Sequence, residues 1–302
     1  MFPRRRQLIL PLAYTHNNNN GGLWLSSEPN SLPFPSHPKY RSSTVAVGSK
    51  IFFIRAGSRE PSSDLWILDT RSGNMTQGPS MSVPRVGRDA AVGVIDGKIY
   101  VIGGGGFHDE IEVEVFDPKS ETWELAGVEY GRKALRCSAS VERKVYMVEN
   151  NEIDVYNPRE GERERMVHMV SKTLAEGGRK DRLKNVTVGC VCVVEDVFFV
   201  CFDWNGIMWF DKKRNVWRRL VGGWEKRLFF SVKALAEHDG KLAVLYLYHR
   251  YENDSPITRG VWCELVSLHR AGHRICGTVD WSGIAGTVPS SFGFLHCLAV
   301  SN

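Results

Sequence analysis

Four consecutive glycines, Gly103 to Gly106, follow the apolar run "VIDGKIYVI" and are the first residues whose type and spacing could support chemistry. A glycine-rich loop binds phosphate when a helix follows it and the N–H groups of the first helical turn face the anion. Here the glycines lead into "FHDEIEVEV", which is acidic and alternates as a β-strand does. The run therefore predicts close backbone approach within a β-structure rather than a phosphate site.

Two further pairs of residues have spacings that could support metal binding or redox chemistry. His269 and His273 are four residues apart, which suits a metal ion only on a helix, and the region has the pattern of a strand and a turn. Cys190 and Cys192 alternate on one face of an apolar strand, where cysteine packs as a small hydrophobe. Because the chain also has no nucleophile elbow, we expect no catalytic residues, no cofactor and no metal site.

Composition narrows the class of protein. The 302 residues are 42% hydrophobic and 24% charged, with a net charge of +5, which is typical of a globular chain and too mild to indicate nucleic acid. No apolar run reaches the 18 residues of a membrane-spanning helix, and "MFPRRRQLIL" lacks the cleavage site of a signal peptide. Seven cysteines, an odd number, lie mostly in apolar runs, which favours a reducing compartment. We expect a cytoplasmic or nuclear protein without nucleic-acid or membrane partners.

The glycine stretch belongs to a repeated hairpin. Five segments each contain an apolar strand, a tight polar turn and a second apolar strand: "TVAVGSKIFFIRAG", "AVGVIDGKIYVIGG", "SASVERKVYMVENN", "VCVVEDVFFVCFDW" and "VKALAEHDGKLAVLYLY". Asp96-Gly97 in the second segment is a strong hairpin signal. Anchors at residues 51, 99, 145, 197 and 242 are separated by 48, 46, 52 and 45 residues.

Each hairpin is followed by a further strand, as in "VEVFDPKSETWE" and "IDVYNPREGERER". A period near 50 residues with four strands per unit is typical of a β-propeller blade, which buries its faces against neighbouring blades. Trp123 and Trp217 follow two of these strands, and we expect them to wedge between blades. The charged stretch 159–184 lengthens one repeat and is expected to be a solvated excursion that projects from one rim.

The second repeat, "MSVPRVGRDAAVGVIDGKIYVIGG" followed by "VEVFDPKSETWELAG", resembles the kelch repeat. From about residue 23 onward the chain resembles the kelch domain of plant F-box/kelch-repeat proteins, although only one of the five hairpins ends in a true double glycine. The resemblance implies a kelch-type β-propeller that binds proteins. It also implies an N-terminal F-box that docks on a Skp-type adaptor, but the roughly 40 residues before the first repeat show no helical pattern for one.

The chain ends are expected to build one blade together. "QLILPLAY" (7–14) and "LWLSS" (23–27) have the pattern of two strands, and the tail "SSFGFLHCLAV" (290–300) has that of an unpaired strand. We therefore expect an all-β propeller of six blades, each a four-stranded antiparallel sheet, closed by strands from both termini. Residues 1–6 are expected to be a disordered basic terminus, and residues 7–302 a single propeller domain.

A basic residue precedes the first strand of each hairpin: Arg41, Arg88, Arg136, Lys184 and Lys233. We expect these residues to recur around one rim and to bind an acidic peptide or loop of a protein partner. Together with the resemblance, this predicts the substrate-recognition part of an SCF-type (cullin–RING) ubiquitin ligase receptor, in which the adaptor is a partner only if an F-box is present elsewhere. The alternative is a propeller enzyme that acts on a small molecule or glycan in a central channel.

Overall fold

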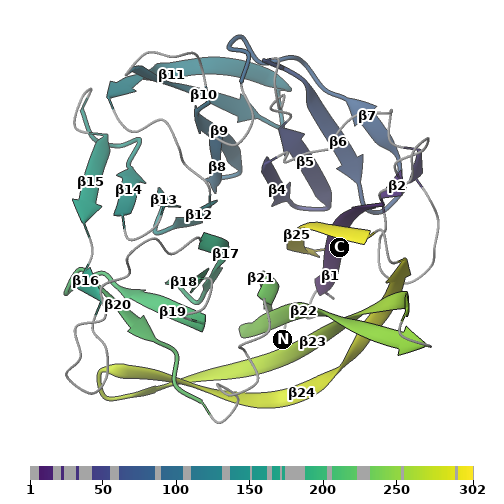
Figure 1. The fold of residues 1–302 in the computed structure, drawn as a ribbon. Helices are drawn as coiled ribbons and strands as arrows, with labels where there is room; N and C mark the ends of the chain where they lie inside the picture. Colours follow the sequence, from purple (N-terminus) through teal and green to yellow (C-terminus); the bar gives the residue numbers. More distant parts are fainter. Residues whose placement is uncertain are drawn as a thin grey trace, which may run out of the picture. The chain divides into compact units, whose positions relative to one another are not determined.

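The computed structural model describes sixteen stretches of the chain. They are residues 7–15, 22–23, 32–33, 43–54, 61–85, 90–104, 110–130, 137–149, 152–161, 165–170, 172–173, 188–202, 206–222, 232–252, 255–289 and 292–301. All regular elements in these stretches are β-strands (Figure 1). The chain divides into two compact units. One unit is Pro38–Ser171, and the other combines Met1–His37 with Lys172–Ser301.

The unit Pro38–Ser171 contains three four-stranded antiparallel sheets. The first sheet is β4 (Ser43–Val47), β5 (Lys50–Ile54), β6 (Leu65–Asp69) and β7 (Met75–Gln77). The second is β8 (Ala90–Ile95), β9 (Lys98–Gly103), β10 (Glu110–Asp117) and β11 (Thr122–Tyr130). The third is β12 (Cys137–Val141), β13 (Lys144–Glu149), β14 (Glu152–Tyr156) and β15 (Met166–Val170). Each sheet follows chain order, as expected of propeller blades.

Tight turns join the first two strands of each blade. Asp96 and Gly97 have φ of 53° and 80°, and Glu142 and Arg143 have φ of 52° and 60°. Two successive residues with positive φ match the right-handed twist of the strands on either side of a two-residue turn. The hairpins expected from the sequence are therefore present at the expected places.

The first strands β4, β8 and β12 lie side by side, and serine side chains satisfy backbone groups between them. Val92 N–H donates to Ser138 Oγ (2.9 Å), and Ser138 Oγ donates to Val92 O (2.9 Å). Val94 N–H likewise donates to Ser140 Oγ at 2.7 Å. Strand β8 comes this close to β12 because residue 93 is glycine, where an added Cβ would lie 2.5 Å from Ser140 Oγ.

Apolar side chains fill both interfaces of the middle blade in this unit. One cluster joins β5 and β6 to β8, β9 and β10, and the partly buried Trp123 packs against it. The other joins the second and third blades, with Ile102, Val145 and Tyr156 at most 1% exposed. Trp123 is thus a wedge between two blades, as expected, and its Nε1 donates to Pro79 O at 2.8 Å.

The other unit also contains three sheets. One is β21 (Val232–His238), β22 (Lys241–Glu252), β23 (Ser255–Ala271) and β24 (Arg274–Pro289). Another is β17 (Val188–Val194), β18 (Val197–Phe202), β19 (Gly206–Asp211) and β20 (Val216–Arg219), with β16 (Lys172–Thr173) added beside β20. The third is β25 (Phe292–Ser301), β1 (Gln7–Thr15), β2 (Gly22–Leu23) and β3 (Leu32–Pro33).

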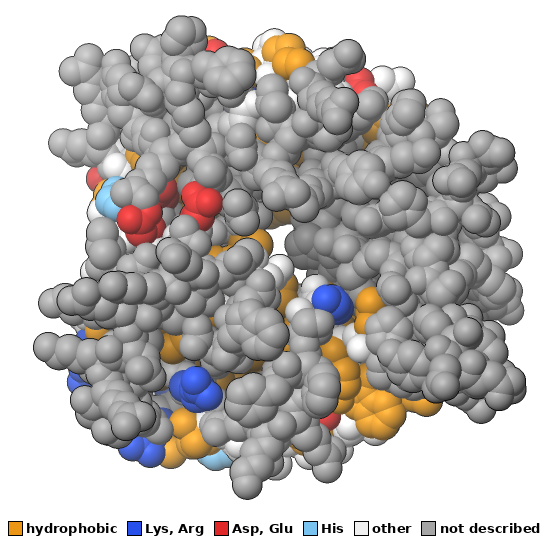
Figure 2. Space-filling view, viewed as in Figure 1, with side chains coloured by type: hydrophobic (Ala, Val, Ile, Leu, Met, Phe, Trp, Pro, Cys, Tyr) orange, Lys and Arg blue, Asp and Glu red, His pale blue; other side chains and the backbone are white. Residues whose placement is uncertain are grey.

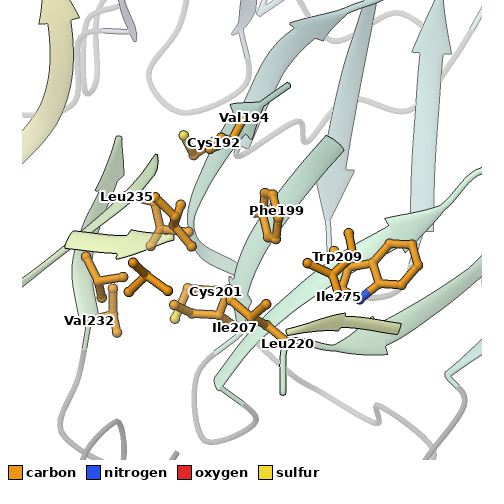
Figure 3. Close-up of a cluster of buried hydrophobic side chains, with 13 residues drawn as sticks. Cys192, Val194, Phe199, Cys201, Ile207, Trp209, Leu220, Val232, Leu235 and Ile275 are labelled. Carbon is orange, nitrogen blue, oxygen red and sulfur yellow. The ribbon is translucent and has the colours of Figure 1, made fainter. Parts of the chain in front are cut away.

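The core of this unit lies between β17–β20 and β21–β24. Figure 3 shows Phe199, Cys201 and Trp209 of one sheet together with Val232 and Leu235 of the other. On the opposite face of β17–β20, Trp217 is fully buried and contacts three phenylalanine rings of its own sheet, at 5.0 to 6.0 Å between centroids.

Both chain ends contribute to one sheet, as expected. Strand β25 pairs antiparallel with β1 from Gln7↔Ser301 to Thr15↔Phe292. The asparagine run 17–20 lies outside the described residues.

The expectation of six blades of four-stranded antiparallel sheet is wrong. Five sheets, not six, have that form, because β16 runs parallel to β20 and gives its sheet a fifth strand. The segment 159–184 was expected to be a solvated excursion, but it contains β15 and β16. The physical reason is that the outer edge of β20 has unpaired backbone groups, which a neighbouring extended segment can satisfy. That residues 7–302 form one domain stays a prediction, and residues 1–6 lie outside the described stretches.

Candidate interaction surfaces

Each blade presents two different ends. At the start end, the first strand of the hairpin begins and the second strand leads on to the third. At the turn end lie the tight turns between the first and second strands and between the third and fourth strands. The strands supply rigid backbone ladders, and the connections at the two ends are the places where variable side chains can meet a partner.

The start end is where the sequence places the basic residues. Lys233, the second residue of β21, is exposed between the buried Val232 and Ala234. It also has no partner in the ladder, because Val232 pairs with Tyr246 and Ala234 with Leu245. Lys233 is therefore the extra residue of a β-bulge, a device that turns a side chain away from the regular sheet face.

The other four basic residues, Arg41, Arg88, Arg136 and Lys184, lie outside the described residues. In the chain they lie one to four residues before the starts of β4, β8, β12 and β17. The five residues are thus not brought together within the described part of the chain, and the basic rim stays a prediction.

The tight turns between first and second strands carry acidic residues, which the sequence reasoning missed. Four of the five hairpin turns carry an acidic residue with positive φ, and these residues are Asp96, Glu142, Glu195, Asp196 and Asp239. The signal was present as "DG", "ER", "ED" and "DG" between paired apolar strands. Aspartate tolerates the left-handed conformation that such turns need, so the turn chemistry itself favours Asp96, Asp196 and Asp239 at these positions.

Some of this charge is compensated locally. Arg143 of one turn forms an ion pair with Asp96 of the preceding blade's turn. Lys212 Nζ donates to the backbone carbonyl of Asp196 at 3.2 Å. Lys119 and Lys213 also lie at the turn end, in the turns between third and fourth strands, and both are exposed.

Three third strands contain a buried carboxylate at the same position, two residues before the residue that pairs with Ile99, Val145 or Leu242 of the second strand. These residues are Glu114 in β10, Asp154 in β14 and Glu264 in β23, and they are 0%, 6% and 1% exposed. Glu114 binds Arg85, Asp154 Oδ1 lies 2.6 Å from His168 Nδ1, and Glu264 accepts a hydrogen bond from Tyr246 Oη at 3.1 Å. Figure 2 shows acidic side chains beside a histidine over β14 and β15.

The first two residues of the glycine run, Gly103 and Gly104, lie beside the buried pair of Arg85 and Glu114. Arg85 Nη1 donates to Gly103 O at 2.5 Å while Nη2 of the same guanidinium binds Glu114. Gly103 and Gly104 have φ of 72° and 74°, and a Cβ on Gly104 would lie 2.8 Å from the Cβ of Ala90. These two glycines therefore permit close packing at the end of β9, as the sequence analysis predicted.

The residues weighed for metal or redox chemistry lie in strands and turns. His269 is in β23 and His273 is in the turn that follows, so their spacing is not helical. Cys192 is buried in β17, and burial raises the pKa of its thiol. Within the described stretches no group of three or more His, Cys, Asp or Glu side chains could hold a metal ion. Those stretches also contain no helix long and apolar enough to cross a membrane.

Comparison with known proteins gives one consistent result. Residues 12–285 match the family model described as "FKB95, Kelch-repeats domain". The putative F-box/kelch-repeat protein At2g41360 of Arabidopsis thaliana is 38% identical over 295 residues, which cover 90% of this chain and 74% of that protein. The F-box/kelch-repeat protein At2g44700 of the same plant is 36% identical, with 96% of this chain and 73% of that protein covered. A third relative, the F-box/kelch-repeat protein At2g22030 of A. thaliana, is 35% identical over 85% of this chain and 68% of its own length.

Proposed function

Because the chain belongs to the F-box/kelch-repeat family through its kelch-repeat domain, we propose that it recognises a protein substrate for an SCF-type ubiquitin ligase. The observation that carries the proposal is the family match over residues 12–285. The strand framework supports it, since packed sheets with connections gathered at their ends form a rigid scaffold for variable binding residues. In this function the kelch sheets select the substrate, and an F-box would contact a Skp-type adaptor.

The ligase assignment is tested by affinity capture of the tagged protein from native tissue at its natural expression level. Co-purification of a Skp-type adaptor, together with a protein whose ubiquitination falls when the gene is silenced, is the expected result. Recovery of a stable protein partner without any adaptor would contradict the ligase role and leave the recognition role standing. Loss of every partner would contradict both.

We propose further that the start end receives an acidic segment of the substrate. Lys233 is exposed there, and Arg41, Arg88, Arg136 and Lys184 precede the corresponding strands in the other blades. Arginine can bind a carboxylate through two parallel hydrogen bonds, which gives geometric selectivity as well as affinity.

A labelled decapeptide of glutamate serves as the probe, with binding followed by fluorescence anisotropy at low and high salt. The variant Arg88→Glu/Arg136→Glu should bind at least about tenfold more weakly, equivalent to about 1.4 kcal/mol. The matched control, Lys119→Glu/Lys213→Glu, changes net charge equally but at the turn end, and should retain binding. Equal losses in both variants would show that net charge, and not the start end, governs binding.

A further inference from the structure

Strand β24 is the outer strand of its sheet, and most of its outer side has no partner strand among the described residues. It is 16 residues long and pairs with β23 along one side. On its other side, the described part of the chain supplies only a bridge from Val221 to Cys276. In that bridge Val221 N–H donates to Ile275 O at 3.1 Å, and Gly277 N–H donates to Val221 O at 2.7 Å. The outward backbone groups of β24 therefore already accept an extended segment at one point.

Beyond this bridge the edge carries exposed apolar side chains. Trp281 is 46% exposed and Ile284 is 53% exposed. The other large hydrophobic side chains that the described structure exposes are single residues, Leu125 on β11 and Val167 on β15. An uncovered edge strand with apolar side chains is a site for pairing with another strand.

The edge also lacks the charges that usually protect such strands. Residues 275–289 contain one acidic side chain, Asp280, and no lysine or arginine. Lys241 and Ser267 both bind Asp280 Oδ2, so its charge is neutralised within the sheet. Two copies of this edge can consequently approach each other without like-charge repulsion.

We propose that β24 pairs with β24 of a second copy of this chain, antiparallel and centred on Gly283. A two-fold axis at Gly283 places Trp281 opposite Ala285 and Ser282 opposite Ile284 of the second copy. The tryptophan ring lies over Gly283 of its own strand, because a Cβ on Gly283 would lie 2.7 Å from Trp281 Cζ2, and so it leans toward the proposed axis. Two rings then cover two glycines on one face of the joined sheets.

The extent of the regular edge determines how strong the pairing is. The β23–β24 register shifts on each side of Trp281–Ile284, at Asp280 and at Ala285. Such bulges twist an edge and limit the length that a second strand can pair with. A short self-complementary edge yields a small interface, and small interfaces associate weakly and reversibly. Exchange between monomer and dimer is thus the expected behaviour, rather than a permanent dimer.

Sedimentation velocity of the full chain, from about 5 to about 500 µM, tests the proposal. The sedimentation coefficient should rise with concentration toward that of a dimer. Trp281→Lys removes the apolar ring that covers Gly283 and puts a charge beside the axis, and it should raise the dissociation constant at least about tenfold. Leu125→Lys is the matched control, since it removes an exposed hydrophobic side chain from the outer strand of another blade, and it should leave the association unchanged.

Circular dichroism checks that each variant is folded. If Trp281→Lys is unfolded, Ile284→Lys takes its place, and hydrogen exchange of the unmodified chain at low and high concentration supplies an independent measurement. Slower exchange of the amides in 281–284 at high concentration is expected. A chain that sediments as a monomer at every concentration, or a Leu125→Lys variant that is equally weakened, would overturn the proposal.

Discussion

The guanidinium of Arg85 donates to the carboxylate of Glu114 at 2.7 Å, and neither side chain has any exposure to solvent. Arg85 precedes β8 and Glu114 lies in β10, so the pair joins the entry segment of the second blade to its third strand. Ser82 N–H and Val83 N–H also donate to Glu114, at 2.7 and 3.3 Å, and Arg85 reaches the carbonyls of Gly103 and Glu112. This ion pair thus fixes the segment that links the first blade to the second, because it binds that segment to strand β10.

Replacing Arg85 by methionine should lower the free energy of unfolding by about 3–5 kcal/mol, because the Glu114 carboxylate would stay buried without its cation. Chemical denaturation of the two proteins measures the difference. Adding Glu114→Leu to the variant should recover part of the loss, since the unpaired charge is then removed. As a surface control, Lys98→Met breaks a pair with Asp117 at 3.5 Å and should cost less than about 1 kcal/mol.

Gly93→Ala should destabilise the contact between β8 and β12 by about 1–3 kcal/mol, as overpacking does elsewhere. The added methyl would lie 2.5 Å from both Ser140 Oγ and Val145 Cγ2, and Val145 is fully buried. Denaturant midpoints of the two proteins provide the measurement. Ser140→Ala serves for comparison and should cost about 1 kcal/mol, because Val94 N–H loses its acceptor. An unchanged midpoint for Gly93→Ala would show that the two strands lie further apart.

Asp211 should make the stability of the folded protein decrease as the pH falls into the acidic range. Burial would raise the pKa of Asp211, but hydrogen bonds from Arg218 and Arg214 outweigh burial, so the pKa lies below its ordinary value. The unfolded pKa is about 4, and the folded pKa is lower, so the carboxylate contributes its full stabilisation above about pH 4. That contribution is lost as the pH falls through the folded pKa.

Melting temperatures of the unmodified chain and Asp211→Asn, recorded from about pH 7 to about pH 2, test this. The unmodified chain should be the more stable at neutral pH, and the gap should close in acid. Asp239→Asn changes a residue in an exposed turn and controls for the loss of one negative charge. A gap that stays constant across the series would contradict the assignment.

The cysteines should differ in reactivity according to burial. Burial raises the pKa of the Cys263 thiol to about 12, with a smaller contribution from the Glu264 charge, and burial also raises the pKa of Cys192. Since the thiolate is the reactive form, both should resist iodoacetamide at pH 8 in the folded protein. Cys137, Cys190 and Cys276 are partly exposed and should be modified first.

Peptide mass spectrometry with and without denaturant measures this order of modification. All cysteines should react at comparable rates in the unfolded chain. Early modification of Cys192 or Cys263 under native conditions would mean that the packing between the blades opens readily.

The sequence alone determined the repeating hairpins, their turns and the pairing of the chain ends. These follow from local patterns: apolar residues in short runs, Asp-Gly and similar pairs with the turn conformation they favour, and an unpaired strand at each terminus. Family membership was evident in the same way, because "VEVFDPKSETWE" and the glycines before it are contiguous in the chain.

Only the tertiary structure decided the features that join distant residues. The parallel β16 beside β20, the burial of Arg85 against Glu114 and the bulge at Lys233 each depend on which backbone groups or charges lacked a partner after the hairpins had formed. The edge of a strand can pair with many different segments, and a buried charge can be neutralised by residues at several positions. The local sequence pattern therefore does not predict which partner is used. Tertiary packing selects the partner of each edge and each buried charge, because only one arrangement both satisfies the buried polar groups and fills the space between the sheets.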